Sequence, residues 1–132
     1  MADQIQVVIG ELSLFTERIV KRIALNLDAN LRETTPVDTG WARANWVLNV
    51  GAPFPTTAGS RAAAEQGSID HSPHDAGVLK VAAGYKLGPP IYETNNVPYI
   101  GKLNNGSSAK APAAFIQAAI VRAVEQTVAR PG

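Results

Sequence analysis

An apolar stripe in the first third of the chain constrains the fold more than any other feature of the sequence. Large aliphatic and aromatic residues recur there at steps of three and four, at Leu12, Phe15, Ile19, Ile23, Leu27 and Leu31. Because an α-helix has 3.6 residues per turn, this spacing gathers them on one face of a helix of about six turns. Pro36 disfavours helical backbone at the residue before it. The pattern therefore predicts a long amphipathic helix that ends near Thr34 or Thr35.

The residues before this stripe are predicted to lie outside the helix. Apolar residues alternate with their neighbours from Ile5 to Ile9, and Gly10 follows them. Alternation of period two is typical of a strand, and glycine often ends an element. We therefore expect a short strand or an extended N-terminal arm over residues 1–10.

Two short segments carry strand signals. The segment Asn45–Val50 alternates Trp46, Leu48 and Val50 with smaller or polar residues, and Gly51 and Pro53 end it. A second candidate, Ile91–Thr94, lies between a proline pair and Asn95-Asn96. Two such strands predict a small, antiparallel sheet.

Shorter elements are expected around these strands. Asp38 or Thr39 can cap a helical turn over Trp41–Asn45, and the Asp-Thr-Gly turn before it suggests a positive φ at Gly40. Residues 52–77 show no sustained period and predict a long, variable connection with at most one helical turn. Residues 78–85 are expected to form a short helix.

The C-terminal segment has the period of a second amphipathic helix. Pro112 suits the first helical position, and apolar residues then repeat every four residues at Ile116, Ile120, Val124 and Val128. Phe115 and Ala119 widen this stripe. Arg130 is placed favourably at the negative end of the helix dipole. The whole pattern predicts a single α+β domain over residues 1–132, in which a long N-terminal helix and a C-terminal helix flank the sheet.

Composition excludes several kinds of chemistry. There is no cysteine, which removes disulfides, thiolate nucleophiles and thiolate-rich zinc sites. Twelve basic and eleven acidic side chains give a net charge of +1, so a densely cationic nucleic-acid binder is not indicated. The uncharged apolar stretch over residues 111–121 is much shorter than the ~20 residues of a membrane-spanning helix. These features favour a protein made in the cytoplasm without a membrane partner.

One cluster could hold a metal ion. Residues 70–75 read Asp-His-Ser-Pro-His-Asp, so His71 and His74 are the candidate ligands. Their stretch has little pattern and no third histidine completes the set, so a solvated polar loop is the more favoured interpretation. No catalytic residue and no cofactor are predicted, because the nucleophile, phosphate-loop and dinucleotide motifs are all missing. Carboxylates along the first helix are interpreted as solvated charges at Glu11, Glu17, Asp28 and Glu33.

The two tryptophans are the strongest candidates for packing anchors. Trp46 is expected in the core, and Trp41 at an interface with a partner. The alternative is that Trp41, Arg43 and nearby lysines present a surface to single-stranded nucleic acid.

Two motifs resemble those of a family of tailed-bacteriophage virion proteins, the neck or tail-completion proteins that join the head to the tail. The first is Thr-Pro-Val-Asp-Thr-Gly-Trp-Ala-Arg-Ala-Asn-Trp over residues 35–46. The second runs from Asn95-Asn96-Val97-Pro98-Tyr99-Ile100 through residues 103–108 to residues 111–115. In this second motif Lys110 stands where the pattern has glutamine, and Ala114 stands where it has glycine.

The resemblance implies structural and interface roles for the motif residues, and no enzymatic activity. The candidates are Pro36, Asp38, Thr39, Gly40, Trp41, Arg43, Trp46, Asn96, Pro98, Tyr99, Leu103, Gly106 and Pro112. It further implies a homo-oligomeric ring of six or twelve copies in the virion neck, between the capsid connector or adaptor and the tail tube or terminator proteins. DNA would pass through the lumen of this ring without specific binding. The ring symmetry would repeat Lys80, Lys86, Lys102 or Lys110 around it.

Other functions remain open from the sequence. A tail terminator or minor tail protein would be a variant within the same class. A small metal-dependent enzyme would depend on His71 and His74, and a nucleic-acid-binding module would depend on Trp41 and Arg43.

Overall fold

The chain forms two long helices, four shorter helices and two strands within the residues that the structure describes. This computed structural model describes residues 2–36, 40–106 and 113–131. The helices are α1 (Ala2–Thr34), α2 (Trp41–Ala44), α3 (Arg61–Glu65), α4 (Ser72–Gly84), α5 (Ile100–Asn104) and α6 (Phe115–Ala129), and the strands are β1 (Val47–Val50) and β2 (Ile91–Thr94).

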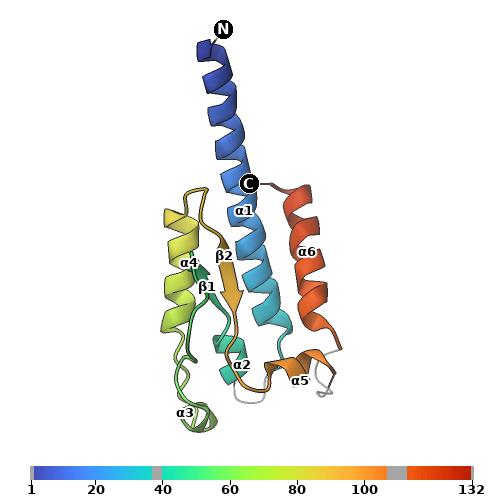
Figure 1. Cartoon of the computed structure of the whole chain (residues 1–132). Coiled ribbons are helices and arrows are strands. Elements are labelled where there is room, and N and C mark those ends of the chain that lie inside the picture. The colour runs from blue at the N-terminus through green and yellow to red at the C-terminus, as the bar shows by residue number, and fades with distance from the viewer. Residues whose placement is uncertain (1, 37–39, 107–112, 132) are drawn as a thin grey trace.

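The predicted α+β architecture is confirmed. The two strands pair antiparallel, with Val47 opposite Thr94 and Leu48 opposite Glu93. Figure 1 shows α1 in the middle of the molecule, with α6 along one side and the strands and α4 on the other. Helix α6 makes its main contact with α1, and α4 covers β1.

Three small clusters make up the core, and they follow the order of these layers. Trp46 packs with Leu31, Phe115 and Ala119 between α1 and α6. Leu48 packs with Ala24 and Val81 between β1, α1 and α4. The third cluster lies below the strands and contains Trp41, Ala42, Ala64 and Val97.

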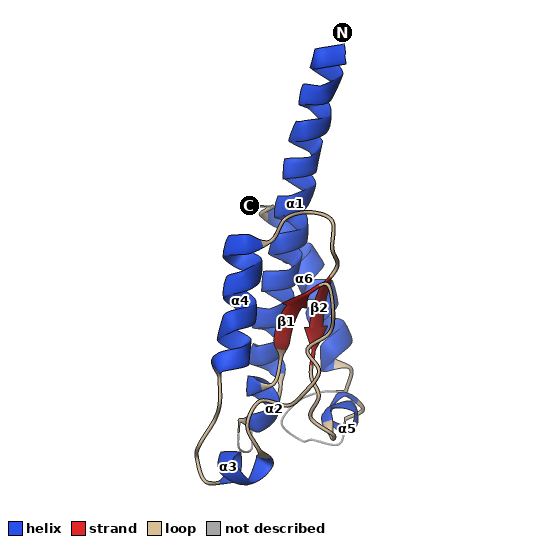
Figure 2. Cartoon of the chain, turned by 60° about the vertical axis from the view of Figure 1, so that its left-hand side comes forward, coloured by secondary structure: helices blue, strands red, loops and turns tan. Residues whose placement is uncertain are grey.

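The predicted end of the first helix is confirmed, and its predicted start is wrong. Helix α1 ends at Thr34, two residues before Pro36, but it begins at Ala2 and contains the whole segment that was expected to be a strand or extended arm. Helix propagation is favourable once a helix is nucleated, and the packed half of α1 supplies the nucleus. Figure 2 shows the N-terminal half of α1 projecting beyond every other element.

The segment 52–77 contains more helix than predicted. Helix α3 is the single helical turn that was expected, but α4 begins at Ser72 rather than near Val78. Asp70 accepts hydrogen bonds from the backbone and side chain of Ser72, and Pro73 occupies the first turn of the helix. These two features start the helix inside the polar cluster.

The last helix begins later than predicted and buries only part of the predicted stripe. Pro112 lies outside the described residues, and α6 begins at Phe115. The buried set is Phe115, Ala119, Ala123 and Thr127, whereas Ile120, Val124 and Val128 are exposed. Small residues let α6 approach α1 closely, so the predicted stripe of large residues lies to one side of the contact.

Candidate functional site

The first motif ties the end of α1 to the loop after β1. Gly40 has a φ of 88°, so the expected positive φ is confirmed, and Asp38 and Thr39 lie outside the described residues. Arg43 donates from Nη2 to the backbone oxygens of Glu33 and Thr35, where the last helical carbonyls lack partners. Pro36 is buried beside them.

Both tryptophans lie in the core of the chain. Trp46 is buried and donates from Nε1 to Thr35 Oγ1 at 2.8 Å, as expected for a core anchor. Trp41 is only 7% exposed and donates from Nε1 to the Ala58 oxygen at 3.1 Å. The prediction of a partner interface at Trp41 is therefore wrong, and this buried ring cannot stack on nucleic acid either.

The second motif holds the loops at the same end of the molecule. Asn96 donates from Nδ2 to the backbone oxygens of Phe54 and Thr56. Tyr99 lies against Trp41, with the ring centroids 6.1 Å apart. The Arg61 guanidinium lies over the Tyr99 ring, 5.4 Å from the ring centroid. Leu103 packs on two of the core clusters.

The remaining members of this motif shape the entry to α6. Pro98 is exposed, and Gly106 donates its backbone N–H to the Leu103 oxygen. Asn104 accepts from the backbone N–H groups of Ala114 and Ile116. Ala114 has a φ of 61°, and it is the single non-glycine residue with a positive φ in the described part of the chain.

The two metal candidates do not come together in one site. His71 is exposed at the start of α4, while His74 is buried and turned toward α1. Within the described ranges, no group of three His, Cys, Asp or Glu side chains is arranged to hold a metal ion. His74 instead bonds to charged residues.

His74 and Asp28 form a buried ion pair between α4 and α1. His74 Nε2 lies 2.7 Å from Asp28 Oδ2, and the side chains are 7% and 5% exposed. His74 Nδ1 also lies 3.1 Å from Asp75 Oδ1, so both ring nitrogens face carboxylates. The Asp28 hydrogen bond raises the pKa of His74 against the opposing effect of burial. The interpretation of Asp28 as a solvated charge is therefore wrong.

Arg32, one turn after Asp28 on α1, is a third charged residue in contact with His74. Its Nη1 lies 3.1 and 3.2 Å from the two ring nitrogens of His74. Within the plane of the imidazole ring, a ring carbon lies between the two nitrogens and blocks any atom from coming this close to both. Arg32 Nη1 therefore lies over the face of the ring. The positive Arg32 guanidinium lowers the pKa of His74, but less than the Asp28 hydrogen bond raises it.

Glu93 of β2 brings a second buried carboxyl group to the cluster. The pKa of Glu93 is raised from 4.5 to about 10, mainly by burial and further by the charge of the neighbouring Asp28 carboxylate. Asp28 Oδ1 and both Glu93 oxygens have no partner at ordinary hydrogen-bond distance among the described residues. A proton on Glu93 removes a negative charge that both its burial and the nearby Asp28 carboxylate disfavour.

The sequence carried only faint signals of this cluster. Asp28 lies four residues after Ala24 and three before Leu31, which places it on the buried side of α1. Glu93 occupies the inner position of a four-residue strand opposite Leu48, beside a cavity of about 230 Å³ lined by aliphatic residues of α1 and both strands. Neither residue forms a recognisable motif, because the cluster joins positions far apart in the chain.

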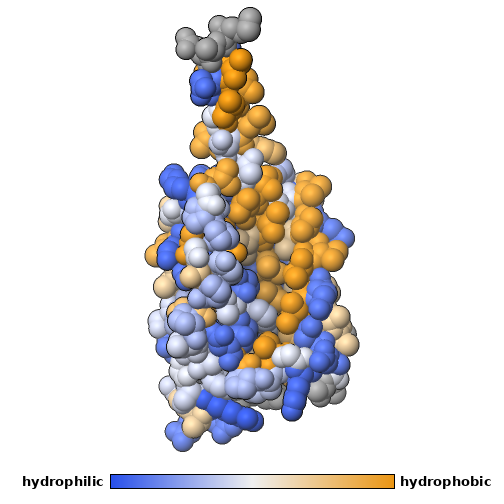
Figure 3. Space-filling model, in the orientation of Figure 1, coloured by the Kyte–Doolittle hydropathy of each residue, from blue (hydrophilic) through white to orange (hydrophobic). Residues whose placement is uncertain are grey.

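The most extensive unpaired surface is apolar. Every residue from Gln4 to Thr16 of α1 is exposed, and we call this segment the arm. Its large apolar side chains, each about half exposed, are Ile5, Val7, Val8, Ile9, Leu12, Leu14 and Phe15. Helix α6 exposes Ile120, Val121, Val124 and Val128, which we call the outer face of α6. Figure 3 shows hydrophobic side chains running along the arm and α6.

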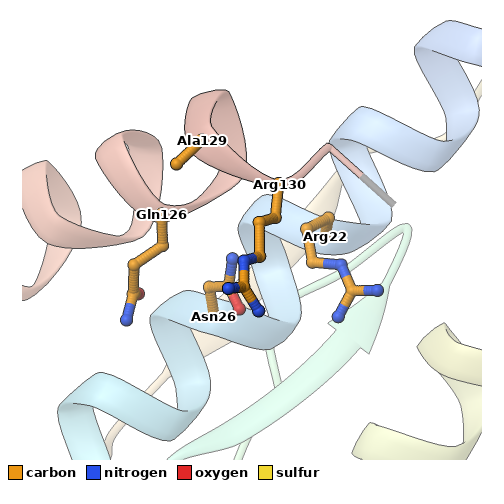
Figure 4. A pocket seen from close by; sticks show the side chains of 5 residues that line it. All are labelled: Arg22, Asn26, Gln126, Ala129 and Arg130. Atoms are coloured by element: carbon orange, nitrogen blue, oxygen red, sulfur yellow. The ribbon is translucent and has the colours of Figure 1, made fainter.

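A polar pocket lies where α6 ends against α1. It has a volume of about 540 Å³ and is lined by Arg22, Asn26, Gln126, Ala129 and Arg130. Figure 4 shows the Arg22 and Arg130 side chains extending from neighbouring helices into the same region. Neither arginine has an ion-pair partner within the described residues.

Comparison of the chain with protein-family models, curated proteins and solved structures gives no match. Among the described residues, no helix is both long enough and apolar enough to cross a membrane.

Proposed function

We propose that this chain is a structural subunit of a tailed-phage virion, a neck or tail-completion protein that assembles with copies of itself into a ring. The observation that carries the proposal is the exposed apolar surface of the arm and of the outer face of α6. Isolated soluble domains rarely leave contiguous apolar patches of this extent uncovered, and such patches are typical of sites for protein partners.

The arm is the stronger half of this argument. A helix that projects without tertiary contacts gains no stability from packing within its own chain. Its large apolar residues nevertheless make up more than half of the segment from Ile5 to Phe15, seven of eleven positions. Such a composition is costly for a free helix in water and is favourable when a partner covers it.

The motif residues support the same proposal in a different way. Trp41 and Tyr99 pack against each other below the strands, and Asn96 holds the loop of Phe54 and Thr56 there, so these residues order loops. Ala114, at the position where the virion family pattern has glycine, takes up the backbone conformation that favours glycine. This conformation is compatible with a glycine at that position, which supports the resemblance on which the proposal draws.

Locating the chain in virions tests the proposal. Cryo-electron microscopy of particles from the phage that encodes it, combined with copy counting by mass spectrometry of extracted tails, should place several copies at the head–tail junction. Particles that contain none of this chain would refute a virion role, whereas copies found only at the far end of the tail would refute the neck position.

A further inference from the structure

We propose that the arm of one copy packs on the outer face of α6 of a second copy, and that Glu11 of the arm binds between Arg22 and Arg130 of that copy. This inference rests on the proposed ring assembly and specifies its contact.

The first observation is the spacing of apolar residues along the arm. Ile5, Val8, Leu12 and Phe15 follow one another at steps of three, four and three, and Ile19 continues the pattern. This is the spacing of a seam that packs against another helix. All four residues are about half exposed, so the seam has no helix against it in the isolated chain.

The second observation is that this seam continues an existing interface. Steps of three and four lead from Phe15 through Ile19 and Arg22 to Asn26, and Asn26 donates from Nδ2 to Thr127 Oγ1 of α6 at 3.0 Å. The face of α1 that packs on α6 therefore continues beyond the end of α6, and this continuation is uncovered. Since α1 is one continuous helix that leads away from its own α6 (Figures 1 and 2), the arm cannot fold back onto α6 of the same chain.

The third observation is charge complementarity. Arg22 and Arg130 line one pocket without a carboxylate, and two neighbouring guanidinium groups repel each other. Glu11 lies on the arm between the exposed Val7, Val8 and Leu12, and it has no ion pair within the described residues. A carboxylate placed between two arginines forms the charge-assisted hydrogen bonds that they favour most.

A second copy is the occupant that uses all of these surfaces. The outer face of α6 ends at Val128, which is 77% exposed and lies two residues before Arg130. On the arm, the apolar Leu12 is adjacent to the charged Glu11. Each surface therefore has a large apolar residue close to a charged one, and the two charges are opposite in sign. Contact between two different surfaces of identical chains is heterologous, and repetition of such a contact closes into a ring when the rotation allows it.

Engineered cysteines test this contact, because the chain contains none of its own. The double variant Leu12→Cys with Val128→Cys is oxidised at a concentration at which the wild-type chain is oligomeric, and each single variant serves as a control. We expect covalent ladders that end in a closed ring for the double variant, and uncrosslinked chains for both single variants. Efficient dimers of the single Leu12→Cys variant would instead indicate two arms paired with each other and would overturn the proposal.

Charge reversal provides a second readout. The Glu11→Arg variant should raise the dissociation constant of the assembly by about tenfold, and adding Arg130→Glu should restore most of the affinity. Unchanged assembly in the single variant, or no rescue in the double variant, would refute the Glu11 contact. An oligomeric wild type that gives no cross-link in the double cysteine variant would refute this docking mode alone, whereas a chain that stays monomeric under all conditions would refute the ring proposal with it.

Discussion

His74 Nε2 lies 2.7 Å from Asp28 Oδ2, and this contact joins two helices through residues 46 positions apart in the sequence. Both ring nitrogens of His74 face carboxylates, which is the arrangement of a protonated imidazole that donates twice. The charge of the cluster depends on the protons of His74 and Glu93, the two groups whose pKa values are raised. Its stability therefore depends on where its protons are held.

Replacement of Glu93 by glutamine should flatten the pH dependence of stability. The pKa of Glu93 is raised from 4.5 to about 10, so the folded state keeps a proton that the unfolded chain releases above pH 4.5. The free energy of unfolding must then fall as pH rises between these values. Glutamine imitates the protonated group, so between pH 5 and pH 8 the variant should lose about 4 kcal/mol less than the wild type. Chemical denaturation at several pH values measures this difference. Glu125→Gln, on the exposed side of α6, is the control, and equal slopes in wild type and Glu93→Gln would contradict a buried proton.

Replacement of Asp28 by asparagine should lower the pKa of His74. The Asp28 hydrogen bond is the largest cause that raises this pKa, whereas the Asp75 contact is a smaller one on an exposed side chain. A raised histidine pKa adds stability that is fully present below pH 6.5 and is lost as pH rises through the folded pKa. Asp28→Asn should therefore destabilise the fold by about 3 kcal/mol in acidic solution. NMR titration of His74 and denaturation at pH 5.5 measure both effects, and Asp75→Asn should change each of them less.

Gly77 should tolerate no side chain. A Cβ atom at this position would lie 2.3 Å from the backbone oxygen of Leu48, because α4 packs directly on β1. Gly77→Ala must push the helix from the strand and should cost about 3 kcal/mol of unfolding free energy. Gly84 lies at the end of the same helix with nothing within 4 Å of its Cβ position, so Gly84→Ala should be neutral or stabilising. Similar thermal midpoints for the two variants would show that α4 and β1 are not in close contact.

Replacement of Ala114 by glycine should stabilise the chain. Ala114 has a φ of 61°, a conformation that costs an alanine roughly 1 kcal/mol and costs glycine little. The neighbouring Ala118→Gly variant, inside α6, should destabilise by a similar amount because glycine weakens a helix interior. Denaturation midpoints compare the two variants, and destabilisation by Ala114→Gly would contradict the turn geometry before α6.

The elements of the fold were predictable where local signals fix them. Pro36 marks the end of α1, and the proline and asparagine pairs around Ile91–Thr94 give β2 its bounds as predicted. The arm was predicted wrongly because Ile5, Val7 and Ile9 alternate like a strand, while Ile5, Val8 and Leu12 have helical spacing in the same residues. Continuity with the packed half of α1 decides between these two patterns.

The candidate sites depend on distances that no local pattern contains. Asp28 and Arg32 have the spacing of a solvated pair on one helix. They are covered because α4 carries His74 against them, and the predicted start of α4 lay after His74. Trp41 was expected to face a partner, but the Ala58 oxygen and the ring of Tyr99 enclose it in the chain. Large residues of α6 were expected to form its apolar stripe, but alanines and Thr127 share the buried face with Phe115 instead.

The account depends most on self-assembly through the arm, and native mass spectrometry of the purified chain over a range of concentrations tests it directly. We expect a closed oligomer of defined copy number for the wild type. The variant Leu12→Glu with Phe15→Glu should be a folded monomer, because these exposed residues contribute little to the fold of a single chain. Ser13→Glu, on the side of the arm away from Phe15 and Glu11, should still assemble. A wild-type chain that remains monomeric at every concentration, or an oligomer that survives the two glutamates, would contradict the account.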